Sequence, residues 1–137
     1  MAIKAAIPYL DLRGKAQEAV ALYERALGAK VESLQRFGDV QQNCPDAMKN
    51  HVMHAVLRVG GATIYLSDGS PAGQVEAGGT LSIALDIDSA SQGRESFAAL
   101  AEGGTVLQPL IDAPWGAMFG ALQDRYGINW MFNVAKG

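Results

Sequence analysis

Some residue types are scarce in this sequence, and their scarcity excludes several kinds of site. Cys44 stands alone, so the chain can form neither an intrachain disulfide nor a cysteine-pair metal site. Its loop-like neighbours indicate a bystander thiol rather than a nucleophile. His51 and His54 are the two histidines, and their three-residue spacing along a strand would place them on opposite faces. A metal ion shared by both is therefore not expected.

Excess positive charge and long apolar runs are also lacking. The chain has 11 basic and 14 acidic residues scattered along its length, with a net charge of −3. Without a basic stripe, a nucleic-acid partner is not expected. Residues 1–7 contain one lysine and no long apolar run, so we expect neither a signal peptide nor membrane contact, and a cytoplasmic location.

What is present is typical of a globular protein. Hydrophobic residues make up 49% of the chain and charged residues 18%, which is too apolar for a disordered tail. A length of 137 residues is enough for one domain with its own core and short for two. We therefore predict a single domain over residues 1–137.

The sequence repeats itself at a fixed distance. Leu10-Asp11-Leu12 matches Leu85-Asp86-Ile87, and Gly28-Ala29-Lys30-Val31 matches Gly103-Gly104-Thr105-Val106, each pair being 75 residues apart. A constant offset indicates a duplicated supersecondary unit. We predict two modules, residues 1–70 and 78–137, within the one domain.

Hydrophobic periodicity predicts one helix in each module. The first spans residues 15–27. The second starts at Asp88 or Ser89 and ends at Gly103-Gly104. Gly93 lies inside this second helix and lowers its helix propensity.

Alternating polar and apolar residues predict two hairpins, which complete a βαβββ order in each module. The expected strands cover 52–59 and 62–67 around Gly60-Gly61, and 117–123 and 128–134 around Asp124-Arg125-Tyr126-Gly127; loops are expected at 38–50 and 68–79.

The period of two along a strand sorts the side chains into two faces. One face is apolar and is expected to pack under the helices; it holds Leu10, Leu12, Ala55, Leu57, Ile64, Leu66, Leu81, Ile83, Leu85, Ile87, Trp130, Phe132 and Val134. The other face is polar and aromatic; it holds Ile7, Tyr9, Asp11, His54, Val56, Arg58, Thr63, Tyr65, Ser67, Ser82, Ala84, Asp86, Asn129, Met131 and Asn133.

A two-residue turn at Gly60-Gly61 fixes which of these side chains meet: Val56 with Tyr65, Arg58 with Thr63 and His54 with Ser67. The predicted fold class is α+β, with two βαβββ modules forming a curved mixed sheet and the helices on its convex side. The polar concave side suits a small-molecule cleft, and plain solvent exposure is the alternative interpretation.

Several motifs of this chain resemble the vicinal oxygen chelate superfamily, which includes glyoxalase I, bleomycin-resistance proteins and extradiol dioxygenases, and within it the PhnB-like subgroup. The motifs extend over nearly the whole chain. They are Pro8-Tyr9-Leu10, Ala21-Leu22-Tyr23-Glu24-Arg25-Ala26-Leu27-Gly28, His54-Ala55-Val56-Leu57-Arg58-Val59-Gly60-Gly61, Leu66-Ser67-Asp68, Trp115-Gly116-Ala117-Met118-Phe119-Gly120 and Asp124-Arg125-Tyr126-Gly127-Ile128-Asn129-Trp130.

The resemblance also indicates where a metal would bind. Metal-using members place four ligands, mostly His and Glu, on the first and fourth strands of the modules. The corresponding residues here are Ile7, Tyr65, Ser82 and Met131. This set does not suit a divalent ion. We therefore expect neither a metal nor another cofactor.

Two functional labels carried by the subgroup find no support in the residues. A methyltransferase would need a way to hold a nucleotide cofactor, and no glycine-rich loop here follows a strand and opens a helix with an acidic residue downstream. No residue indicates a role in phosphonate metabolism either.

Each candidate site residue has a functional and a structural interpretation. His54 is suited to general acid or base catalysis, or is tied by a hydrogen bond to Ser67, which we favour. Arg58 binds an anionic ligand or lies solvated beside Thr63. Asp11 and Asp86 occupy equivalent places near strand ends, where structural use is favoured over paired acid chemistry.

The aromatic candidates divide in the same way. Tyr9 and Tyr65 can stack on a flat ligand or pack, and Trp115 can form a wall of the cleft at the start of the seventh strand. Trp130 falls on the helix-facing side and is better explained by core filling.

The sequence thus favours a metal-independent small-molecule-binding protein of PhnB-like type, and the alternative is a glyoxalase-like lyase or isomerase with His54 as acid or base. The resemblance implies a homodimer, for which Ile7, Tyr9, Met131 and Phe119 offer an apolar seam. The predicted ligand-binding residues are Tyr9, His54, Arg58, Tyr65, Ser82, Trp115, Phe119 and Met131.

Overall fold

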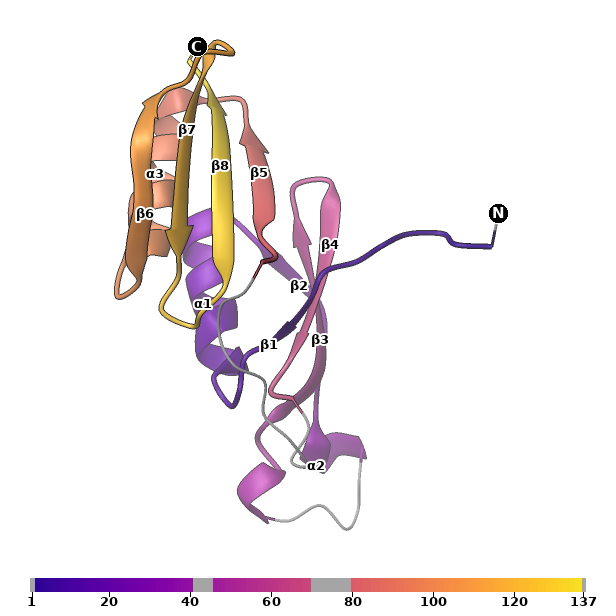
Figure 1. Ribbon diagram of the computed structural model, residues 1–137. Helices are drawn as coiled ribbons and strands as arrows, with labels where there is room; N and C mark the ends of the chain where they lie inside the picture. Colours follow the sequence, from indigo (N-terminus) through magenta and orange to yellow (C-terminus); the bar gives the residue numbers. More distant parts are fainter. Residues whose placement is uncertain (1, 41–45, 70–79, 137) are drawn as a thin grey trace. The chain divides into compact units, whose positions relative to one another are not determined.

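The computed structural model describes residues 2–40, 46–69 and 80–136, which fold as two compact units (Figure 1). The first unit is Met1–Val75 and the second is Glu76–Gly137. Each unit contains one four-stranded mixed sheet and one long helix. The fold is α+β with repeated βαβββ units, as the sequence predicts.

The first unit has its strands in the order β1-β4-β3-β2, with β1 parallel to β4 and the other pairs antiparallel. Its elements are β1 (Tyr9–Asp11), α1 (Ala16–Leu27), β2 (Lys30–Arg36), α2 (Phe37–Val40), the 3₁₀ helix η1 (Asp46–Met48), β3 (Val52–Val59) and β4 (Ala62–Ser67).

The hairpin between β3 and β4 has the predicted register. Val59 pairs with Ala62, so Gly60-Gly61 form a two-residue turn, and Gly60 has a φ of 56°. Such positive φ values are easy for glycine because it has no Cβ. Val56 lies opposite Tyr65 and Arg58 opposite Thr63, which confirms that these side chains share a face.

Helix α1 is closed at both ends by residues outside its own span. Gly28 adopts the left-handed conformation, with a φ of 66°, and its N–H donates to the carbonyl oxygen of Glu24. Lys15 at the N-cap accepts no hydrogen bond through its side chain. Instead, Asp68 after β4 accepts the N–H groups of Ala16 and Val52, both at 2.7 Å. One carboxylate therefore joins the start of α1 to the start of β3.

The predicted loop at 38–50 is partly wrong. It contains the end of α2 and all of η1, and the N–H of Gly38 donates to the carbonyl oxygen of Lys49. Cys44 and most of the predicted loop at 68–79 lie outside the described residues. Single helical turns have too few residues to produce a readable period.

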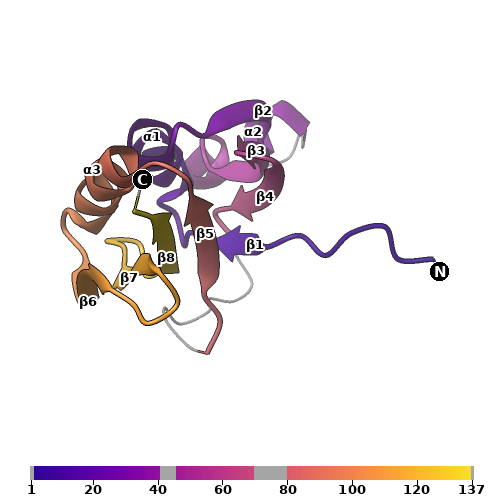
Figure 2. The same ribbon diagram turned by 90° about the horizontal axis from the view of Figure 1, so that it is seen from above.

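The second unit repeats this topology with the order β5-β8-β7-β6, in which β5 is parallel to β8. Figures 1 and 2 show its helix lying along one face of its sheet. Its elements are β5 (Ile83–Ile87), α3 (Ala90–Ala101), β6 (Thr105–Asp112), β7 (Ala117–Gln123) and β8 (Asn129–Ala135).

Helix α3 starts where the sequence places it and packs unusually closely. The Ser89 hydroxyl accepts the N–H of Gln92 at 3.3 Å, which makes Ser89 the N-cap. A Cβ added at Gly93 would lie 2.4 Å from Cγ1 of Val134 on β8. Gly93 therefore permits a close helix-to-sheet contact, a role that its low helix propensity alone does not reveal.

The β7–β8 hairpin is organised by a buried carboxylate. Asp124 is 3% exposed, and its Oδ1 accepts the N–H groups of Tyr126 and Ile128. Its Oδ2 accepts Nε1 of Trp130 at 2.9 Å. Trp130 is itself buried, so the prediction that it fills the core is confirmed.

The predicted apolar face is largely correct. Leu12, Leu57, Leu66 and Phe132 are each at most 1% exposed, whereas Leu81 is 79% exposed. The placement of Leu81 in the core was wrong because β5 begins only at Ile83. Within the described residues, no helix is long and apolar enough to cross a membrane.

Candidate functional site

Three predicted site residues of the first unit lie in mutual contact, and we call Tyr9, His54 and Tyr65 the aromatic group. Tyr9 on β1 pairs with Tyr65 on β4 in the parallel register, and His54 lies on β3. The ring centroids are 4.9 Å apart for His54 and Tyr65, 5.6 Å for Tyr9 and His54, and 6.0 Å for Tyr9 and Tyr65. These separations fall within the range of favourable aromatic pairs.

The hydrogen bond of His54 differs from the one that the sequence favoured. Its Nδ1 lies 3.1 Å from the hydroxyl oxygen of Tyr9. The hydroxyl of Ser67 instead accepts the N–H of Gly69, and Ser67 is buried. The predicted tie between His54 and Ser67 is therefore wrong: the β3–β4 pairing extends from Val59–Ala62 only to Ala55–Leu66, and Tyr9, on a strand distant in sequence, supplies the partner of His54.

This contact determines what the far nitrogen of His54 can do. If the Tyr9 hydroxyl donates to Nδ1, the neutral imidazole carries its proton on Nε2 and donates there; if Nδ1 donates, Nε2 accepts. Among the described residues, Nε2 has no hydrogen-bond partner. The imidazole is therefore anchored on one side and available to a ligand on the other.

Arg58 lies exposed opposite Thr63, as one of its two interpretations predicted, but it also has an ionic partner. Its Nε lies 3.4 Å from Oε2 of Glu32 on β2, and both side chains are nearly half exposed. Glu32 therefore lies beside the guanidinium, and an anionic ligand would have to compete with it. No local pattern indicates this pairing, because Glu32 and Arg58 meet only through the pairing of β2 with β3.

In the second unit, three side chains form a hydrogen-bonded chain. Nε1 of Trp115 donates to Oδ1 of Asn133 at 2.9 Å, and Nδ2 of Asn133 donates to Oδ1 of Asp86 at 3.2 Å. We call Trp115, Asn133 and Asp86 the polar chain. Trp115 also contacts the ring of Phe119, with centroids 5.8 Å apart. Trp115 and Phe119 were predicted to bind a ligand, whereas Asn133 was not.

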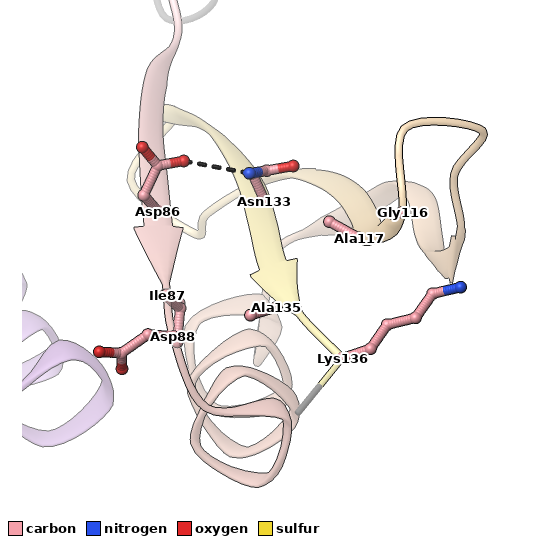
Figure 3. A pocket seen from close by; sticks show the side chains of 8 residues that line it. All are labelled: Asp86, Ile87, Asp88, Gly116, Ala117, Asn133, Ala135 and Lys136. Atoms are coloured by element: carbon pink, nitrogen blue, oxygen red, sulfur yellow. Dashed lines mark hydrogen bonds between the residues drawn. The ribbon is translucent and has the colours of Figure 1, made fainter.

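A hollow of about 510 Å³ is lined by two members of the polar chain, Asp86 and Asn133. Figure 3 shows the side chains that line it. All its lining residues belong to the second unit; they are Asp86, Ile87, Asp88, Gly116, Ala117, Asn133, Ala135 and Lys136. This volume falls within the range of small-molecule sites. A signal for it was present in the sequence, because Asp86 and Asn133 both appear on the predicted polar face.

The remaining predicted residues lie apart from these groups or outside the strands. Ser82 is exposed and precedes β5. Met131 lies on β8, paired with Ala84 and Ala121, and is 36% exposed. Asp11 accepts the N–H of Arg13 at 2.9 Å, a structural use that agrees with the favoured interpretation.

The side chains do not fit the divalent metal that the resemblance associates with this fold. The four positions expected for ligands hold Ile7, Tyr65, Ser82 and Met131, of which Ile7 and Ser82 precede their strands. Within the described ranges, no group of three or more His, Cys, Asp or Glu side chains is placed to hold an ion. This donor set lacks the nitrogen and carboxylate ligands of a catalytic metal site.

Comparisons with known proteins agree with this fold. The family described as 3-demethylubiquinone-9 3-methyltransferase matches residues 4–132. Protein YjdN of Escherichia coli (strain K12) is 32% identical over 94% of both chains.

Two solved structures are similar over nearly their whole length. Protein PA1353 from Pseudomonas aeruginosa is 38% identical, with a TM-score of 0.86 over 97% of this chain and 98% of that one. A Bacillus cereus protein described as a putative 3-demethylubiquinone-9 3-methyltransferase, PhnB protein, has a TM-score of 0.80 at 23% identity, covering 96% of this chain and 100% of its own, and shows the fold alone. The family match over residues 4–132 and the 32% identity to YjdN show that this chain belongs to the family described as 3-demethylubiquinone-9 3-methyltransferase, and its repeated βαβββ units have the fold that the PhnB-like motifs predict.

Proposed function

We propose that the protein binds a small molecule with a flat ring through the aromatic group of the first unit, without a metal ion. The observation that carries this proposal is the contact among Tyr9, His54 and Tyr65, whose rings lie together on one face of the sheet. Tyr9 remains 53% exposed, so part of this aromatic surface is open to a ligand.

The physical basis is the free energy of covering exposed aromatic surface. A ring placed against Tyr9 or Tyr65 removes apolar area from water and gains about 0.5–1.5 kcal/mol from ring geometry in addition. The hydroxyl of Tyr65 and Nε2 of His54 then offer polar contacts that fix the ligand's orientation. Binding of this kind suits a ligand that carries a hydroxyl or carbonyl on its ring.

Independence from metals follows from the donor set. Tyr65 stands where metal-using relatives place a ligand on the fourth strand, and Met131 occupies the corresponding place in the second unit. A tyrosine or a thioether binds Zn²⁺, Ni²⁺ or Mn²⁺ poorly beside apolar and hydroxyl neighbours. Treatment with a chelator should therefore leave ligand affinity unchanged.

The test is a titration with 2-naphthol, with decahydro-2-naphthol as its saturated counterpart of similar size. The ring signals of His54 and the tyrosines would be followed by NMR in EDTA-treated protein. We expect 2-naphthol to bind about twofold to tenfold more tightly, because the gain from ring geometry of about 0.5–1.5 kcal/mol corresponds to a ratio of that size.

Tyr65→Met is the matched variant, since methionine stands at the corresponding position of the second unit. It should weaken 2-naphthol by about fivefold or more, whereas Thr63→Val on the same strand should change its affinity by less than about twofold. Equal binding of the saturated alcohol, or loss of binding in EDTA, would contradict the proposal.

A second candidate function is a lyase or isomerase reaction with His54 as the acid or base. It is favoured by one observation: Tyr9 holds Nδ1, while Nε2 lacks a partner among the described residues. A positioned imidazole of this kind typically contributes about 10²–10⁴-fold to proton transfer.

This candidate can be tested with 2-hydroxyacetophenone, which combines a flat ring with an acidic C–H beside a carbonyl. Proton NMR in D₂O would follow deuterium incorporation at that carbon. Catalysed exchange that falls by about 100-fold in His54→Gln would support it. Exchange no faster than in buffer would restrict the aromatic group to binding.

A further inference from the structure

We propose that the hollow of the second unit binds a small organic amine, with the carboxylate of Asp86 as its anchor. This inference is independent of the ring-binding site proposed for the first unit. It depends on the hollow, on the fixed orientation of the polar chain and on the charge of the lining residues.

The orientation of the polar chain follows from its donors. The indole N–H of Trp115 can only donate, so the atom of Asn133 that meets it must be the carbonyl oxygen Oδ1. The NH₂ group of Asn133 is thereby turned toward Asp86, to which it donates. A neutral donor thus holds Asp86 in place at the edge of the hollow without cancelling its charge.

Asp86 has no cationic partner among the described residues. Lys136 is the one cation among the described lining residues, and its Nζ lies 3.8 Å from Oδ1 of Asp112 instead. In Figure 3 the Lys136 side chain extends away from Asp86, while Asp88 points to the side opposite Asn133. The lining therefore carries an unpaired carboxylate beside a neutral amide, which favours a ligand with a positive charge.

The rest of the lining indicates the body of the ligand. Ile87, Ala117 and Ala135 are the apolar residues of the lining, and Gly116, with a φ of 91°, has no side chain. A compact apolar or aromatic group fits between these residues, while its amine reaches Asp86. Because an exposed ion pair alone contributes little, the apolar body is needed for measurable affinity.

The test uses benzylamine, with benzyl alcohol and benzoate as neutral and anionic molecules of similar size. Binding would be followed through the Asn133 side-chain amide and the Trp115 indole N–H signals in ¹H–¹⁵N NMR spectra, which report on the polar chain itself. We expect benzylamine to shift both signals with saturation, at an affinity about tenfold or more above that of either control molecule.

Asp86→Asn is the decisive variant, because an asparagine oxygen can still accept the bond from Asn133 while the charge is removed. It should weaken benzylamine by about tenfold, whereas Glu95→Gln, which removes a charge from an exposed position of α3, should have less than about a twofold effect. Unchanged benzylamine affinity in Asp86→Asn, or equal binding of benzyl alcohol, would overturn the inference. Tyr65→Met should leave benzylamine binding intact, so the two proposals can fail separately.

Discussion

The two units use one scaffold for different surface chemistry. In both units, the first strand lies parallel to the last. The residues that pair between these two strands in one unit have equivalents that pair in the other unit. Tyr9 pairs with Tyr65 in the first unit, and Ala84 pairs with Met131 in the second. The next position on the same face pairs Asp11 with Ser67 in one unit and Asp86 with Asn133 in the other.

The difference lies in how far the polar side chains reach. In the first unit, Asp11 and Ser67 accept hydrogen bonds from nearby backbone, at Arg13 and Gly69. In the second, the Asp86 side chain bonds across to Asn133 and borders a hollow. Burial constrains the helix-facing side of a sheet, whereas the opposite side is free to diverge, so similar backbones can present a stacking surface in one unit and a hydrogen-bonding surface in the other.

The β-hairpins of the two units offer the largest expected contrast. The first turn is two glycines, whereas the second depends on Asp124 and its three bonds to Tyr126, Ile128 and Trp130. Asp124→Ala leaves buried donors without partners, so we expect a loss of roughly 3 kcal/mol or more in the free energy of unfolding. Urea titration followed by Trp130 fluorescence would measure it.

Gly61→Ala in the first hairpin is the control for this prediction, because an added Cβ there meets nothing within 4 Å. It should cost less than about 1 kcal/mol. If the two variants unfold at similar urea concentrations, the contrast between the hairpins is incorrect.

The helices differ at their fourth residue, which is Ala19 in α1 and Gly93 in α3. Gly93→Ala gains helix propensity but drives its methyl group into Val134, so we expect a net loss of about 1–3 kcal/mol. Glu95→Ala, on the exposed side of α3, should be nearly neutral in the same thermal melt. If the Gly93→Ala protein has a higher melting temperature than the parent protein, the sheet can move enough to accommodate the added methyl group.

The contacts at the N-termini of α1 and α3 are expected to differ less in the stability that they contribute. Ser89 caps α3 locally, so Ser89→Ala should cost about 1 kcal/mol. Asp68 closes α1 from a distance and serves β3 as well, so Asp68→Ala should cost more, about 2–3 kcal/mol. Chemical denaturation of both variants tests the order, which would be reversed if the Asp68 contacts were incidental.

The smallest expected effect concerns the solvent-exposed ion pair of the first unit. Glu32→Gln removes the charge that faces Arg58, and because both side chains are nearly half exposed the loss should be under about 1 kcal/mol. The difference should shrink further in 1 M NaCl, as measured by thermal unfolding. A large or salt-independent loss would mean that Arg58 has a structural role that its contacts do not reveal.

Much of the scaffold is predictable because hydrophobic periodicity and glycine turns are local signals. The strands at 52–59, 62–67 and 117–123 coincide with β3, β4 and β7, and the offset of 75 residues relates the two units correctly. The start of β5 was misplaced because Leu81 continues the apolar alternation beyond the paired residues, and alternation does not show where hydrogen bonding begins.

The residues of the aromatic group could be predicted from the sequence, but the contacts that each of them makes could be predicted less well. Tyr9, His54 and Tyr65 share a face because of strand period, which the sequence reveals. That His54 bonds to Tyr9 instead of Ser67 depends on the parallel pairing of β1 with β4, which no local pattern encodes. The polar chain was missed for a similar reason, since Trp115 lies in the turn before β7 and Asn133 on β8, and no local pattern indicates that they meet.

The three-residue strand β1 has a consequence for the timing of motion in the first unit. It is an edge strand whose backbone pairs with β4, and it joins residues more than fifty positions apart in the chain. Short edges of this kind detach at a lower free-energy cost than the interior of a sheet, so their amide protons exchange early. Each detachment would withdraw the Tyr9 hydroxyl from His54, and the lifetime of the anchored imidazole would then be set by the peeling of one strand rather than by unfolding of the unit.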